Sequence, residues 1–67
     1  RPQLTDAQRE VLRAAYETGY FGVPRGATMS DLADQFGVSD TAISQRIRRA
    51  MQRLVEEAVI DHDPDRP

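Results

Sequence analysis

The sequence predicts an all-α fold: a small bundle of three main helices, of which the last is the longest. With 67 residues the chain has the size of one small domain with a thin hydrophobic core. Apolar residues recur at the spacing of helix faces, and no segment alternates with the period of two that a strand requires. A Ser or Thr precedes each of three such segments, as helix starts favour.

The first helix is predicted to begin after Thr5, because Gln8 stands three residues later and completes a capping box. Its apolar residues have the spacing of one buried face, and Gly19 is placed to end the helix in a left-handed conformation. The members of this face are Val11, Leu12, Ala15 and Tyr16.

Residues 19–26, with the sequence GYFGVPRG, are predicted to be a connector, because three glycines and a proline oppose regular structure. The connector holds two of the four aromatic residues of the chain. We expect its large apolar side chains to fold back onto the core rather than to stand in water. They are Tyr20, Phe21 and Val23.

A second helix of about two turns is predicted to follow Thr28, with Asp31 where a negative charge complements the helix dipole. Gly37 ends this helix. Its apolar positions are Met29, Leu32, Ala33 and Phe36.

The third helix is predicted over residues 40–59, with Ser39 as its cap and a length of about 30 Å. Residues 60–67 are polar and broken by proline, so we expect a disordered tail after a domain that spans residues 4–59. The inward face of the helix consists of Ile43, Ile47, Ala50 and Leu54.

Residues 32–47 have the pattern of a helix-turn-helix motif. Ala33 is small enough to let two helices approach, and Gly37 permits the positive φ that a tight turn needs. Val38 fills the corner, and Ile43 anchors the following helix. Because several constraints agree, the pattern predicts a domain that places its third helix in the major groove of DNA.

Several kinds of chemistry are opposed by the composition. The chain has no cysteine, and its one histidine, His62, lies in the polar tail, so metal sites and Ser-His catalysis are not expected. The longest apolar run, residues 58–60, is far too short to span a membrane. We therefore expect neither an enzyme nor a cofactor, and no membrane partner.

The distribution of charge favours nucleic acid in one segment only. The whole chain carries −2, and all its basic residues are arginines. Residues 55–67 are strongly acidic, whereas residues 41–55 hold four arginines and no acidic residue. These arginines are Arg46, Arg48, Arg49 and Arg53.

The outward face of the third helix has the side chains of a recognition helix. At about 100° per residue, the face opposite the predicted core carries residues that read base edges, since Arg pairs with guanine and Gln with adenine. The expected base-contacting residues are Thr41, Gln45, Arg48 and Gln52. Helix starts, hydroxyls and flanking arginines bind phosphates. The expected phosphate contacts are Thr28, Ser39, Ser44, Arg49 and Arg25.

Other interpretations of the same helix stay open. An arginine-rich face is often only solvated, and Arg46 and Arg53 lie at its edges, where they could pair with acids of the chain. The second half of the helix continues an apolar spacing typical of a coiled-coil seam. Either it covers the first helix, which is favoured for Ile47 and Leu54, or it pairs with a second copy. The residues most open to such a homodimer are Met51, Ala58 and Val59.

Residues 4–55 closely resemble the bacterio-opsin-activator type helix-turn-helix domain of haloarchaea. The distinctive parts are the loop GYFGVPRG, residues 19–26, and the helix SDTAISQRIRRA, residues 39–50. The resemblance implies sequence-specific binding of double-stranded DNA by the C-terminal module of a cytoplasmic transcription regulator. It also implies an upstream sensor domain, which this chain does not contain. The alternative is a protein-interaction module that docks on the transcription machinery or on that sensor.

A haloarchaeal origin would account for the absence of lysine and the acidic balance. High salt weakens phosphate contacts, because counterion release then yields less free energy. We therefore expect one isolated copy to bind DNA weakly and the whole regulator to use dimeric or multivalent engagement.

Overall fold

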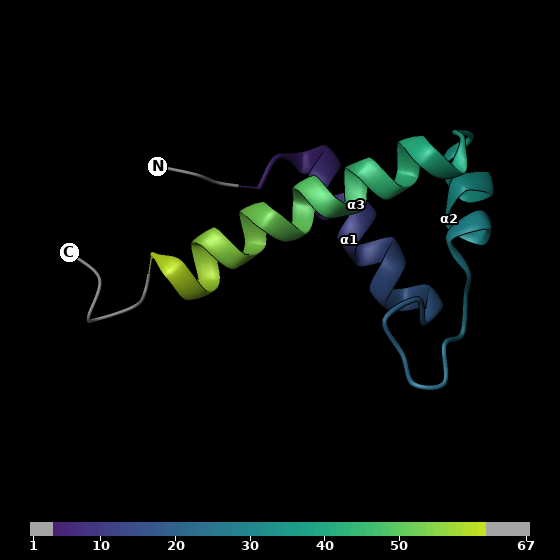
Figure 1. Cartoon of the computed structure of the whole chain (residues 1–67), viewed down its shortest axis with the longest axis horizontal. Helices are drawn as coiled ribbons and strands as arrows, with labels where there is room; N and C mark the ends of the chain where they lie inside the picture. The colour runs from purple at the N-terminus through teal and green to yellow at the C-terminus, as the bar shows by residue number, and fades with distance from the viewer. Residues whose placement is uncertain (1–3, 62–67) are drawn as a thin grey trace.

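A computed structural model describes residues 4–61, which are helical apart from the turns and one loop (Figure 1). Helix α1 spans Asp6–Thr18, α2 spans Met29–Phe36 and α3 spans Asp40–Val55. A π-helical turn, η1, continues α3 over Glu56–Ile60. No strand occurs between residues 4 and 61, so the predicted all-α class is confirmed.

Helix α3 runs along the long axis of the molecule, and α1 and α2 both pack against it (Figure 1). The two shorter helices contact the part of α3 that follows the turn, while its far end extends beyond them (Figure 1). The molecule is therefore elongated, with extents of 41 × 24 × 17 Å. One helix thus serves both as the floor of the bundle and as a projecting arm.

All the predicted helix starts are present. The Thr5 hydroxyl accepts a hydrogen bond from the Gln8 amide at 3.1 Å, and the Gln8 side chain accepts one from the Thr5 amide at 3.0 Å. Thr28 and Asp31 form the same reciprocal capping box at the start of α2. Gly19 and Gly37 end α1 and α2 with φ of +87° and +67°. Local side-chain chemistry therefore sets the boundaries of these helices.

The core is small and lies where the three helices meet. Val11, Leu32 and Ile43 supply its larger side chains, one from each helix, and all are at most 2% exposed. Small residues fill the rest and let the helices approach closely. These are Ala14, Ala15, Ala33 and Ala50, with Ile47 beside them.

Two predictions about α1 and α3 need correction. Tyr16 does not belong to the buried face: its side chain is 77% exposed, and Ala14 is buried instead. The true face is centred on Val11 and Ala15, and Tyr16 lies about 100° beyond Ala15. Leu54, predicted to face inward, is 38% exposed because it lies where α3 begins to leave the bundle.

The connector also differs from the prediction in part. The Gly26 amide donates to the Gly19 carbonyl at 2.8 Å, which closes the loop at its base. Tyr20 lies next to this closure and packs against the core, as expected. Phe21 is 44% exposed and Val23 is 99% exposed, so neither folds back as predicted. Because the ends of the loop are tied together, its middle residues are held out in solvent.

The C-terminal end of the helix is close to the predicted length but different in kind. The last five residues before Asp61 form η1, in which none is buried. The Leu4 amide donates to Glu57 Oε2 at 2.8 Å, which ties this turn to the start of α1. Ile60, predicted as the first residue of the tail, still belongs to η1. Residues 62–67, with His62 and most of the predicted tail, lie outside the described residues.

Candidate nucleic-acid interface

A tight turn fixes how α3 is presented. The Gly37 amide donates to the Asp34 carbonyl at 3.2 Å, and the Val38 amide donates to the Ala33 carbonyl at 3.0 Å. This pairing ends α2 and turns the chain at once into the cap of α3. The Ser39 hydroxyl then accepts a hydrogen bond from the Ala42 amide at 3.1 Å. Helices α2 and α3, as predicted, are joined by only a short turn with a defined geometry.

The predicted base-contacting residues all lie on one exposed side of α3. Ile43, Ile47 and Ala50 are buried beneath the helix, so residues spaced around the opposite direction stand in water. The four polar residues span 11 positions, or about 16 Å along the helix axis. All four are exposed: Thr41, Gln45, Arg48 and Gln52. We call this set the recognition face.

Part of the recognition face is hollowed. Thr41, Gln45 and Arg48 line a shallow polar depression together with Ser44 and Asp40. Gln52 lies one turn further along the helix and does not line it. The first half of the recognition face therefore forms one continuous surface of hydroxyl, amide and guanidinium groups.

Asp40 belongs to this surface and Ser30 contacts it, and neither was predicted from the sequence as a site residue. The Ser30 hydroxyl donates to Asp40 Oδ2 at 2.7 Å, which joins the first turn of α2 to the first turn of α3. Asp40 also lines the polar depression. A carboxylate there can accept a hydrogen bond from the amino group of cytosine and repels phosphate. The sequence signal that points to Asp40 is its position directly after the cap residue Ser39, at the start of the predicted recognition helix.

The predicted phosphate contacts differ in their surroundings. Ser39 uses its oxygen to accept from Ala42, which leaves its O–H free to donate to an anion at the start of α3. Ser44 is partly buried beside the recognition face. Thr28 is exposed and caps α2, but its amide already donates a hydrogen bond to Asp31 Oδ2 at 2.8 Å. Asp31 in the first turn of α2 and Asp40 in the first turn of α3 therefore each place a negative charge near a predicted phosphate contact, which weakens both sites for phosphate.

The two predicted arginine contacts lie apart from the polar depression. Arg49 lines a different depression, together with Arg46, residues of α1 and Phe36 of α2. Arg25 lies in the loop, with its guanidinium 4.8 Å from the centre of the Tyr20 ring. This stacking holds the loop arginine in a defined place. The structure thus brings together Thr41, Ser44, Gln45 and Arg48, and it places Arg49 and Arg25 at the periphery.

The chemistry of the surface suits duplex DNA. The exposed side of α3 carries hydrogen-bond donors and acceptors at the tips of long side chains, and residues 41–55 contain no acid. Such a helix fits the width of the major groove, where each base pair shows a distinct donor and acceptor pattern. No group of three or more His, Cys, Asp or Glu residues between residues 4 and 61 is arranged to hold a metal ion.

Comparison with known proteins decides the family. Residues 4–56 match the family described as the HTH DNA binding domain. The chain belongs to this family. The match covers both helices of the motif, the turn between them and the α1 helix that packs beneath. DNA is therefore a partner of this domain.

The chain is similar to several transcription regulators of haloarchaea, the group that the resemblance implied. A dimethyl sulfoxide reductase transcriptional activator of Halobacterium salinarum is 46% identical over 56 residues, which are 84% of this chain and 25% of that protein. The transcriptional regulator NarO of Haloferax volcanii is 34% identical over 84% of this chain and 26% of its own length. The bacterioopsin transcriptional activator of Halobacterium salinarum is 38% identical over 82% of this chain and 8% of its own length.

The resemblance to the bacterio-opsin-activator type of domain is thus confirmed. The chain spans about a quarter of the length of the first relative. No solved structure matches it significantly. Among the described helices, none has the length and apolar character needed to cross a membrane.

Proposed function

We propose that this domain reads the sequence of double-stranded DNA through the recognition face, as the DNA-binding part of an archaeal transcription regulator. One observation carries the proposal: four polar side chains stand exposed on α3 directly opposite its buried residues, after a capped tight turn. This arrangement lets α3 enter the major groove while α1 and α2 stay behind it.

The roles of the side chains follow from their chemistry. Arg48 can pair with guanine through two hydrogen bonds, and Gln45 can pair with adenine in the same way. Thr41 and Gln52 extend base contact along the groove. The remaining residues hold the phosphates on either side and fix the register of the helix. In this proposal the phosphate contacts are Ser39, Ser44, Thr28, Arg49 and Arg25.

The wider setting is also a proposal. The greater length of the relatives, which are transcriptional activators and regulators by name, supports a regulator in which this domain is joined to a sensor domain. A DNA partner favours a cytoplasmic location and a binding rather than a catalytic role. The domain boundary is proposed at residues 4–59, with a polar tail over 60–67.

We propose that the regulator engages DNA as a homodimer through the second half of α3. Met51, Ala58 and Val59 are all exposed there, and a lone copy offers only a few arginines to the phosphates. Two linked copies on two half-sites bind more tightly than either alone without any new contact to the bases. An intact regulator that binds a half-site and a full site with equal affinity would contradict this part of the proposal.

A second candidate function is docking on a protein partner. The net charge of −2 favours it, since DNA-binding domains are usually basic. Replacing Arg48 and Gln45 discriminates the two functions. If the double variant loses its preference for one DNA sequence, the result supports reading of bases. If the wild type shows no such preference and the variant still binds a protein partner unchanged, the result supports docking.

The test is a fluorescence-anisotropy titration with duplexes selected from a randomised pool, repeated from low to molar KCl. The selected duplex is expected to bind more tightly than its scrambled version at every salt concentration. Arg48→Ala should remove most of this difference. Arg53→Ala is the matched control, because it deletes the same charge on a side of α3 turned about 140° away. Equal binding of both duplexes that vanishes as salt rises would overturn the proposal.

A further inference from the structure

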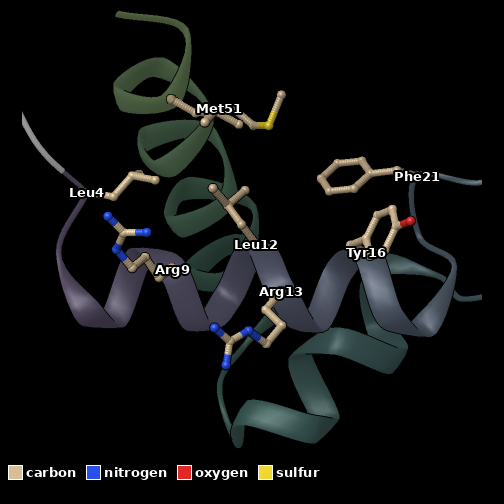
Figure 2. A pocket seen from close by; sticks show the side chains of 8 residues that line it. Leu4, Arg9, Leu12, Arg13, Tyr16, Phe21 and Met51 are labelled. Carbon is tan, nitrogen blue, oxygen red and sulfur yellow. The ribbon is translucent and has the colours of Figure 1, made fainter. Parts of the chain in front are cut away.

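A groove lies between α1 and the second half of α3, on the opposite end of α3 from the turn. Leu12 lies at its floor, Leu4 closes one end and Met51 forms the far wall (Figure 2), and Leu54 also lines it. Tyr16 and Phe21 face each other at the other end (Figure 2). Its free volume is about 500 Å³, within the range of about 300–1,000 Å³ found for ligand pockets. The groove is therefore large enough for several apolar side chains.

Several apolar side chains of the groove are exposed to water. Tyr16 is 77% exposed, and Phe21, Leu54 and Met51 are each more than a third exposed. A chain with so few large apolar residues leaves a considerable share of them on one face. A contiguous apolar patch of this kind marks an interaction surface more often than a solvated one.

The same chain carries an element that fits this groove. Met51, Val55 and Val59 follow one another at intervals of four residues, and all are exposed. The wider turn of η1 lessens the drift that an ideal α-helix would give to this spacing. The stripe lies on the arm that extends beyond α1 and α2 (Figure 1), and no residue of η1 is buried. The Leu4 amide ties Glu57 of the arm to the start of α1, but the apolar stripe itself stays exposed.

The charges around the two elements are complementary. Arg9 and Arg13 lie on the α1 side of the groove, and Arg9 stands next to Leu4 (Figure 2). The arm carries the acidic residues Glu56 and Asp61, which are close in sequence to Val55 and Val59 of the stripe. Asp6 and Glu10 share another depression with the two arginines, so the apolar contact is the larger part of the fit.

We propose that the groove takes the arm of a second copy of this chain. Each copy inserts its stripe into the groove of the other, and Met51 belongs to both surfaces, as a two-fold interface requires. This inference rests on the proposed dimer and names where the second copy sits. The recognition faces remain exposed on both copies, because neither the groove nor the stripe includes them.

The test uses spin labels, since the chain has no cysteine and a single introduced one is labelled alone. Val59→Cys carries the label in one copy, which is mixed with an isotope-labelled copy that has no label. We expect intermolecular broadening of the side-chain signals of Leu4, Leu12 and Phe21. Val23→Cys is the matched control, because Val23 is also an exposed valine but lies in the loop. Sedimentation equilibrium gives the oligomeric state of the same samples.

The outcomes separate the proposals. Broadening confined to the groove from Val59, but not from Val23, supports the docked arm. A dimer that shows broadening elsewhere overturns the groove and leaves the dimer standing. A monomer at every concentration overturns both the groove and the dimer. It does not bear on the reading of DNA, which the anisotropy titration tests. Binding of a small apolar molecule or of another protein in the groove of a monomeric chain would also overturn the second copy as occupant.

A charge exchange gives an independent check. Arg9→Glu should weaken self-association several-fold, and adding Glu56→Arg should restore it. Arg9 is exposed and Glu56 is half-buried, so the fold is expected to tolerate both changes. Failure of the double variant to recover the association would contradict the predicted pairing of the arm with the groove.

Discussion

The two halves of α3 share one helix but differ in almost every physical respect. The first half begins at a capped turn, buries Ile43 and Ile47, and exposes polar side chains. The second half buries little, exposes Met51, Val55 and Val59, and runs into the acidic residues of η1. We propose that residues 40–50 hold the helix in the bundle and, with Gln52, read DNA, whereas the apolar stripe of residues 51–59 serves association.

The largest expected effect is on stability and separates the halves directly. Ile43→Ala should lower the free energy of unfolding by about 2–5 kcal/mol, because Ile43 is fully buried and its loss leaves a cavity. A domain of this size has roughly 3–10 kcal/mol in total, so this one change is expected to remove a large share of the stability. Leu54→Ala, with a partly exposed side chain, should cost less than about 1.5 kcal/mol. Urea unfolding followed by circular dichroism measures both, and equal losses would contradict the comparison.

The next effect concerns the two kinds of arginine on α3. Arg49→Ala should weaken binding to all duplexes alike and reduce the slope of log K against log salt by about 0.9, because it removes one phosphate contact. Arg48→Ala should instead lower the affinity for the selected duplex by about 1–3 kcal/mol. Salt titrations of both variants check this. If Arg49→Ala relaxes sequence preference and Arg48→Ala does not, the assignment of their roles is wrong.

Ser39 has two separable roles at the start of α3. Ser39→Ala should cost about 1 kcal/mol of stability, because the Ala42 amide loses its acceptor. Ser39→Asp keeps an acceptor at the cap, so it should retain stability, but its negative charge should repel the phosphate and weaken DNA binding. Thermal unfolding and anisotropy measured together distinguish the roles. An aspartate variant that binds DNA as the wild type does would remove Ser39 from the phosphate contacts.

The smallest effect is expected at the end of the arm. Val59→Ser should change the free energy of unfolding by no more than about 0.5 kcal/mol when measured on dilute protein, because the Val59 side chain is 58% exposed. The same change should weaken self-association. A large loss of stability in dilute samples would show that the arm is part of the fold of one copy.

Features set by neighbouring residues were predictable from the sequence. The caps at Thr5, Thr28 and Ser39 and the left-handed ends at Gly19 and Gly37 depend on side chains within a few positions. The recognition face followed from the same logic, since a buried Ile43 and Ile47 dictate which residues face outward. Helix boundaries and the exposed face of α3 were therefore predicted well.

Features set by distant contacts were not predictable. The helical spacing from Val11 places Tyr16 on the predicted buried face, and only the packing of the helices shows that Ala14 is buried instead. The exposure of Val23 follows from the hydrogen bond between Gly26 and Gly19, which ties the ends of the loop. The groove combines residues from the segment before α1, from α1, from the loop and from α3. Asp40 gained its role only through contact with Ser30 of α2.

The most direct test of the central claim is an NMR titration of the isotope-labelled domain with the selected duplex. Amide signals should shift most over residues 39–52, and those of Leu12 and Val59 should stay unchanged on a duplex that carries a single half-site, where no second copy is bound. This result would establish that the first half of α3 faces the DNA. Shifts centred on the groove and the arm, with residues 41–48 unaffected, would contradict the division of α3 into a reading half and an associating half.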